Sequence, residues 1–407
     1  MKVNNTERWA RLALSTLVLL FAGIIYTWSI LKLPFSREFG WDSGVLGLNA
    51  TLTIVFFCIG GFISGLLTKK TSPRLRVIIS AVLLFLGFFI TSRLSIDASP
   101  VALYLAYGVL SGTGIGFVYN TTVSITNQWF PDKKGLCSGI MLMGFGLTTL
   151  IIGKAADAMI RSDAIGWRST YLIIAIVIGA LFLLMSFILK APAPGTIFPQ
   201  PKAKNKKHTA AAAPARDFTA VEMVKRPSFW LLFTFIVSLA AVGTAAISFV
   251  TDILREVGGS ENFAVTAAGI LAIFNGLGRL INGVMFDTLG IRKTQYVMSA
   301  FAIAAPLIVV LALLTGSLAL GVIGMMLCFF SYGFAPTTSA AITTAFYGTK
   351  NFSLNFSIVN LILIPAPFAA TLAGNLYKAS GSFISTFIVL IGCAVVGLVV
   401  NLSLRKP

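Results

Sequence analysis

Apolar residues along this chain gather in long runs that short polar segments separate. A helix needs about 20 apolar residues to cross a bilayer, and twelve runs are long enough. They cover roughly residues 9–33, 44–68, 76–94, 101–126, 135–158, 170–189, 229–250, 264–286, 294–315, 318–344, 353–376 and 383–404. The ten-residue alternation typical of membrane-spanning strands is missing. The pattern therefore predicts an all-α membrane protein with 12 transmembrane helices.

Composition supports a chain that is solvated mostly by lipid. Hydrophobic residues make up 57% and charged residues 11%, and the mean hydropathy is +0.91. The first run is too long for a cleaved signal peptide and lacks a small-residue cleavage site, so we expect it to stay in the protein. The four cysteines fall in or beside apolar runs without paired spacing and are expected to be buried small hydrophobes.

The net charge of +18 is explained by membrane orientation. Lys and Arg concentrate in the amino-terminal arm and in alternate loops, above all between residues 190 and 226. Cytoplasmic loops carry such an excess. We therefore expect both termini to be cytoplasmic, a multi-pass protein of the cell (inner) membrane, and no nucleic-acid partner.

A long polar segment divides the chain. Residues 191–228 hold several prolines, the basic run 202–207 and the single histidine, His208. Such a composition cannot bury a core and predicts a mobile cytoplasmic loop, in which His208 is solvated. The flanking regions, 1–190 and 229–407, each hold six spans and are predicted to form two six-helix bundles.

The two halves resemble each other at matching landmarks. Trp9 corresponds to Trp230, and the stretch from Gly65, GLLTKKTSPRLR, corresponds to the stretch from Gly283, GVMFDTLGIRK. A duplicated six-helix unit with pseudo-symmetric halves favours alternating access in a transporter, working as a monomer. Phosphate loops, metal-ligand spacing and paired buried carboxylates are lacking, so we expect no enzyme, no cofactor and no metal.

Arg279 is the single Lys or Arg that lies deep inside a predicted span. It stays protonated at biological pH, and placing it at the bilayer centre costs about 2.5–3.5 kcal/mol on insertion scales. Asn275 and Asn282 share its helix face, at spacings of four and three residues. We expect Arg279 to face a wet cavity and bind an anion. The alternative is a structural charge paired with a buried acid, although no Asp or Glu lies at comparable depth in another span.

Several motifs resemble those of the major facilitator superfamily, in particular its branch of oxalate:formate antiporters and monocarboxylate transporters. The motifs are GVMFDTLGIRK at 283–293, YTWS at 26–29, WFPDKKGLCSG at 129–139 and KRPSFW at 225–230. The resemblance implies that Arg279 binds a substrate carboxylate. It also implies that Tyr119 and Tyr332 place hydroxyl groups around that carboxylate, and Tyr26 joins this expected set.

Departures from the oxalate carriers point to a substrate with one carboxylate. Val359 stands where those carriers have a second buried lysine. Phe145 replaces a tyrosine and Phe356 replaces a tryptophan, which makes the expected cavity more apolar than a dianion needs. Lactate, pyruvate, formate or acetate therefore fits the charge better. An oxalate or other dicarboxylate/formate antiporter, and a permease-like receptor that senses a carboxylate, are the alternatives.

The resemblance also predicts a cytoplasmic latch and leaves the coupling ion open. Asp287, with Arg292 and Lys293, matches the signature in the second half, whereas Lys69 replaces the acidic residue in the first half. Monocarboxylate transporters of animals carry a proton on an aspartate where this chain has Asn275. Asp157 and Asp252, near the outer ends of their spans, are the remaining coupling candidates, so proton symport and anion exchange both stay open.

Overall fold

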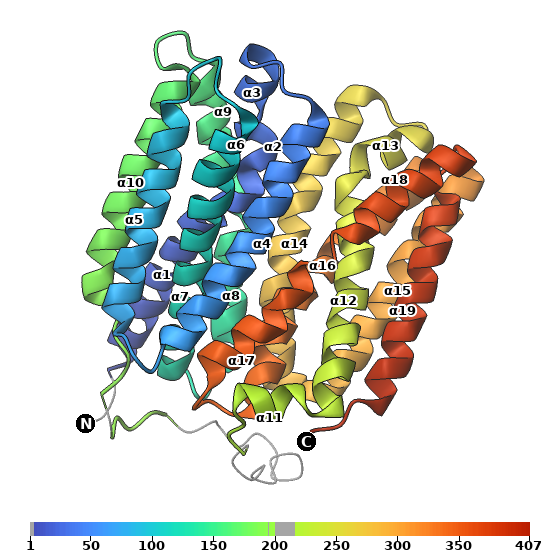
Figure 1. Ribbon diagram of the computed structural model, residues 1–407. Coiled ribbons are helices and arrows are strands. Elements are labelled where there is room, and N and C mark those ends of the chain that lie inside the picture. The colour runs from blue at the N-terminus through green and yellow to red at the C-terminus, as the bar shows by residue number, and fades with distance from the viewer. Residues whose placement is uncertain (1–3, 194, 200–215) are drawn as a thin grey trace. The chain divides into compact units, whose positions relative to one another are not determined.

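The computed structural model describes residues 4–193, 195–199 and 216–407. The basic run 202–207 and His208 lie outside these residues, so the predictions for them stay predictions. The described chain is helical and contains 12 helical stretches that are long and apolar enough to cross a membrane (Figure 1). The prediction of an all-α protein with 12 transmembrane helices is confirmed.

Contacts divide the chain into two compact units. Unit 1 contains Met1–Lys133, Gly144–Lys202 and Phe356–Ile358, and unit 2 contains Lys134–Met143, Ala203–Asn355 and Val359–Pro407. Each unit therefore takes up a short helical segment from the other half of the sequence. The boundaries predicted from the sequence, at 190 and 229, stay a prediction.

Unit 1 is built from the spans of the first half, although residues 134–143 of α8 belong to unit 2. The helical segments of these spans are α1 (Asn5–Ala22), η1 (Gly23–Thr27), α2 (Trp28–Leu31), α3 (Leu33–Glu38), α4 (Ser43–Leu67), α5 (Pro73–Ser92), α6 (Pro100–Leu103), η2 (Tyr104–Ser111), α7 (Gly112–Trp129), α8 (Lys134–Gly146), η3 (Thr149–Gly153), α9 (Lys154–Arg161) and α10 (Gly166–Ile188). Polar residues begin several of them: the Ser72 side chain accepts a hydrogen bond from the amide of Leu75, and Pro73 is the first helical residue of α5. A serine cap followed by proline is a strong start signal for a helix.

Unit 2 holds the spans of the second half, although residues 356–358 of α17 belong to unit 1. The helical segments of these spans are α11 (Ala220–Val224), α12 (Pro227–Ser248), α13 (Val250–Glu256), α14 (Glu261–Leu289), α15 (Ile291–Thr315), α16 (Leu318–Tyr347), α17 (Phe352–Val359), η4 (Asn360–Leu363), α18 (Phe368–Ser380) and α19 (Ile384–Ser403). Within this unit α14 packs closely on α16. A Cβ at Gly278 would lie 2.2 Å from the carbonyl oxygen of Phe330, and one at Gly333 would lie 2.3 Å from that of Asn275. Glycine lets these two backbones touch.

The eleventh span is broken in the middle. After α17 the chain passes through η4 and a turn region, and a regular helix resumes only at Phe368, so Figure 1 shows α17 and α18 as separate helices. Pro365 and Pro367 lie in this turn region and lack the amide hydrogen that a continuing helix requires. Two prolines this close together in one span indicate an interruption, and the structure contains it. Pro306 indicates an interruption of the ninth span in the same way, but here α15 continues through the proline.

Candidate functional site

Arg279 lies in α14 and is completely buried, with 0% of its surface exposed. Its Nη1 donates a hydrogen bond to the carbonyl oxygen of Leu142 at 2.8 Å, and its Nε donates to Oδ1 of Asn275 at 3.3 Å. Asn275 sits one helical turn earlier, as the sequence spacing predicted. These two contacts orient the plane of a guanidinium whose donors match the geometry of a carboxylate.

The backbone around Arg279 is held by contacts within unit 2. Thr337 on α16 donates its hydroxyl to the Arg279 carbonyl at 3.1 Å. On another side, a Cβ at Gly139 of α8 would lie 2.8 Å from that same carbonyl oxygen. The side-chain Nδ2 of Asn282 donates to the Phe334 carbonyl at 2.9 Å and to the Thr338 hydroxyl at 3.0 Å. Asn282 therefore binds α14 to α16, while Asn275 orients the arginine.

Four of the predicted substrate-binding residues meet in an aromatic cluster of unit 1. The ring of Tyr119 lies 5.1 Å from Phe145 and 5.9 Å from Phe356, which stacks on it at an interplanar angle of 18°. Tyr26 contacts Phe145 edge-on at 5.3 Å. Phe57 of α4 lies 5.2 Å from Tyr119. Aromatic pairs at these distances attract one another beyond simple burial, so the cluster forms a firm apolar surface.

The other two predicted substrate-binding residues belong to unit 2. Tyr332 of α16 is partly exposed and packs on α12, where a Cβ at Gly243 would lie 2.2 Å from the tyrosine Cβ. Val359, the last residue of α17, is 1% exposed. A lysine at position 359 would therefore place its charge in a buried environment, which is costly without a partner.

Among the predicted latch residues, Asp287 has the most specific contacts. Its carboxylate accepts hydrogen bonds from the backbone amides of Gly135 at 3.0 Å and Leu136 at 2.7 Å, in the first turn of α8. An acidic group there satisfies amides that have no helical partner and complements the positive end of the helix dipole.

The basic latch residues are more peripheral. Arg292 donates to the Asn401 carbonyl of α19 at 3.1 Å. Lys69 and Lys293 are exposed. Of the four predicted latch residues, the acidic one therefore joins the end of α14 to the start of α8.

Both coupling candidates form ion pairs with arginines on their own helices. Asp157 pairs with Arg161 at 2.9 Å, and Asp252 pairs with Arg255 at 2.9 Å. The side chains of the two acids are 32% and 44% exposed. Exposed pairs of this kind contribute little to stability.

Two parts of the arrangement carry no local signal in the sequence. The Leu142 oxygen is a backbone atom, so residue type does not reveal that it accepts from Arg279. Phe57 is one of 33 phenylalanines, and nothing in its neighbourhood sets it apart. In the described part of the chain, no group of three His, Cys, Asp or Glu side chains could hold a metal ion.

In the comparison with known proteins, the family model and the relatives below agree with one another. The family model described as Major Facilitator Superfamily matches residues 12–367. The oxalate:formate antiporter of Oxalobacter formigenes is 28% identical over 355 residues, which cover 85% of this chain and 80% of that protein. Monocarboxylate transporter 12 of Homo sapiens is 24% identical over 387 residues, covering 87% and 71%. These relatives confirm the resemblance to the branch of oxalate:formate antiporters and monocarboxylate transporters.

A solved structure shows the same fold. The E. coli fucose:proton symporter has a TM-score of 0.70 with 14% identity, covering 98% of this chain and 100% of that one. Taken with a family match that spans most of the sequence, this places the chain in the major facilitator superfamily, as a membrane transporter and not an enzyme.

Proposed function

We propose that this protein is a secondary transporter of a small monocarboxylate, working by alternating access in the cell's inner membrane. The observation that carries the proposal is the complete burial of Arg279 in the middle of a membrane-spanning helix, with its guanidinium oriented by Leu142 and Asn275. A charge kept there against a cost of about 2.5–3.5 kcal/mol is expected to serve function. Its natural ligand is a carboxylate, which accepts two parallel hydrogen bonds from a guanidinium.

Charge count favours a monocarboxylate over oxalate. Arg279 supplies one fixed cation, and the family resemblance implies that Val359 stands where the oxalate carriers have a second. The family resemblance assigns Tyr119, Phe145 and Phe356 to the substrate site, and the two phenylalanines suit the body of a monocarboxylate such as lactate, pyruvate, formate or acetate. We assign to the hydroxyls of Tyr119 and Tyr332 a further hydrogen bond each to the carboxylate.

Two coupling modes are compatible with this site. Asp157 and Asp252 are the acids proposed to carry a proton in symport, and each forms an ion pair with an arginine. The exchange of one anion for another requires no acidic side chain of the protein to carry a proton. We also propose that Asp287 and the amides of Gly135 and Leu136 act as the cytoplasmic latch.

The test is uptake of labelled acids into proteoliposomes that contain the purified protein. The panel holds lactate, pyruvate, formate, acetate and oxalate, each with and without a pH gradient and with and without internal anion. We expect saturable uptake of at least one monocarboxylate. Stimulation by an inward proton gradient identifies symport, and stimulation by internal anion identifies exchange.

An oxalate:formate exchanger is the second candidate, because the relative at 28% identity is an oxalate:formate antiporter. Preferential exchange of oxalate for formate would establish it and remove the monocarboxylate assignment. Binding of a carboxylate without any flux would instead favour a sensing receptor, and flux without saturation would indicate a channel.

A further inference from the structure

The end of the central segment docks on the turn that joins α16 and α17. We call residues 216–219 the strap. Asp217 accepts hydrogen bonds at Oδ1 from the backbone amides of Thr349, at 2.9 Å, and Lys350, at 3.0 Å. Gly348 has a positive φ of 81°, and a Cβ there would lie 2.2 Å from Asp217 Oδ1. The strap therefore lies directly on the turn, in a place that only glycine leaves open.

Phe218 anchors the middle of the strap through both its backbone and its ring. The residue is 2% exposed, its amide donates to the Tyr347 carbonyl at 3.0 Å, and its ring meets the Tyr347 ring edge-on at 5.8 Å. Its carbonyl oxygen accepts two hydrogen bonds, from Nδ2 of Asn351 and from Nδ2 of Asn355, each at 3.0 Å. A single backbone oxygen thus binds two side chains one helical turn apart, the second of them on α17.

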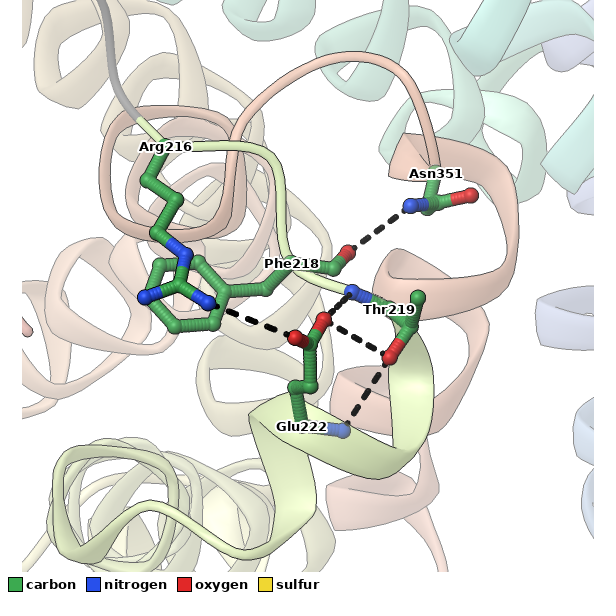
Figure 2. A network of polar contacts seen from close by, with 5 residues as sticks. All are labelled: Arg216, Phe218, Thr219, Glu222 and Asn351. Atoms are coloured by element: carbon green, nitrogen blue, oxygen red, sulfur yellow. Dashed lines mark hydrogen bonds and ion pairs between the residues drawn. The ribbon is translucent and has the colours of Figure 1, made fainter.

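The far end of the strap is held by the start of α11, as Figure 2 shows. Thr219 and Glu222 form a reciprocal capping box, and Arg216 reaches Glu222 at 3.5 Å. Hydrogen bonds from the Thr219 amide and then from its hydroxyl lower the pKa of Glu222. Ionised Glu222 therefore stabilises the folded capping box above the usual pKa of a glutamate, and this stabilisation is lost as the pH falls through the lowered pKa. At neutral pH the capping box therefore fixes the strap at Thr219, whereas the exposed ion pair of Arg216 adds little.

The eight-residue α17 receives little support from α18, because η4 and the turn with Pro365 and Pro367 separate the two helices. Its orientation must come from other contacts. Asn355 is completely buried, and the next residue is Phe356, whose ring stacks on Tyr119. Successive helical residues point about 100° apart. A rotation that loosened Asn355 from the strap would therefore also turn the ring of Phe356.

We propose that the strap is a positioning element for α17: the Phe218 carbonyl, bound by Asn351 and Asn355, sets the rotation of this helix and with it the place of the Phe356 ring. Phe218 and Asn355 are positioning residues, because they act through Phe356. The kinetic consequence of the proposal rests on the transport function proposed above. Its structural part does not.

Hydrogen–deuterium exchange of the full chain in lipid nanodiscs tests the structural part. In the double variant Asn351→Ala/Asn355→Ala, peptides covering 349–360 should exchange at least about tenfold faster, since one buried and one partly buried hydrogen bond are lost. The matched control is Asn262→Ala, an exposed asparagine at the start of α14, which should leave these peptides unchanged. Identical exchange of 349–360 in the double variant and the wild type would overturn the proposal.

A double-mutant cycle on uptake tests whether the strap acts through Phe356. Asn355→Ala should raise KM about 3- to 10-fold, the usual worth of one hydrogen bond. In a Phe356→Ala background the same change should move KM by less than about twofold, because residues that act together are not additive. An equal rise in both backgrounds overturns the proposal. Should the wild type carry none of the acids, the transport function fails, and the exchange measurement still decides whether the strap holds α17.

Discussion

Among single residues, Arg279 combines a permanent charge with complete burial and a fixed orientation. Leu142 and Asn275 accept from its side chain, and Thr337 donates to its carbonyl. A group held in this way loses little freedom when a ligand binds, so more of the interaction appears as affinity. The arginine is therefore expected to dominate carboxylate affinity.

Replacing Arg279 should remove carboxylate binding. Arg279→Ala loses the charge, and Arg279→Lys keeps the charge but loses the planar fork that binds both oxygens. We expect affinity to fall at least about 10- to 100-fold in both, the worth of a charge-assisted hydrogen bond of about 1.5–3 kcal/mol. Affinity is measured by equilibrium binding to purified protein.

Two controls accompany these variants. Arg161→Ala removes an arginine whose side chain is 62% exposed and should bind normally. Size-exclusion profiles and thermal unfolding establish that the Arg279 variants remain folded. Wild-type affinity in folded Arg279→Ala would contradict the assigned role.

At the level of helices, glycines decide which pairs come close. Gly278 and Gly333 let α14 and α16 touch along their backbones. Gly283 does the same for α14 and α8, since its Cβ would lie 2.2 Å from the Gly135 carbonyl oxygen. The helix that carries Arg279, α14, is therefore in close backbone contact with α16 on one side and α8 on another. Replacing any of these glycines with a larger residue should displace α14.

Gly278→Val should destabilise the protein because its Cβ would meet the Phe330 carbonyl oxygen at 2.2 Å. Overpacking of this kind costs about 1–3 kcal/mol. Thermal unfolding in detergent should show a lower midpoint for the variant.

Gly269→Ala is the matched control on the same helix, because nothing lies within 4 Å of a Cβ there. It should unfold no earlier than the wild type, since alanine favours a helix by about 1 kcal/mol over glycine. Equal midpoints for Gly278→Val and Gly269→Ala would show that this close contact does not matter.

For the molecule as a whole, the distribution of cations should determine how the 12 spans sit in the bilayer. Lys69 and Lys70 lie in the exposed turn after α4, and the central segment adds a larger basic group. The opposite ends of the spans carry fewer cations. The positive-inside rule then places the turn after α4 in the cytoplasm and the loop between α5 and α6 outside.

Cysteine labelling of cells with a membrane-impermeant maleimide checks this orientation. Asp97→Cys, in the exposed loop between α5 and α6, should react on intact cells. Lys70→Cys should react only after the membrane is permeabilised. The wild type measures the background from the native cysteines, of which Cys58, Cys137 and Cys328 are buried and Cys393 is half-buried in the apolar helix α19. The reverse labelling pattern would invert the proposed topology.

Much of the candidate site follows from local periodicity. The spacing of Asn275 and Arg279 placed both on one helix face, and the two are hydrogen-bonded. The prolines near 365 predicted the break in the eleventh span, which the structure contains. Turn chemistry and helical period act over a few residues, so a single sequence reveals them. The gathering of Tyr26, Tyr119 and Phe356 was expected only from family resemblance, because these residues lie far apart in the chain.

The sequence by itself determined the class of molecule, the twelve spans and the isolation of one deep arginine, because hydrophobic burial in lipid depends on residue type and length alone. The tertiary structure alone decided which atoms orient Arg279, that Phe57 joins the aromatic cluster and that the strap binds Asn355. Those contacts use backbone carbonyls and helix packing between distant segments. Residue type does not encode them locally, since every residue has a carbonyl and only the fold determines which ones meet a donor.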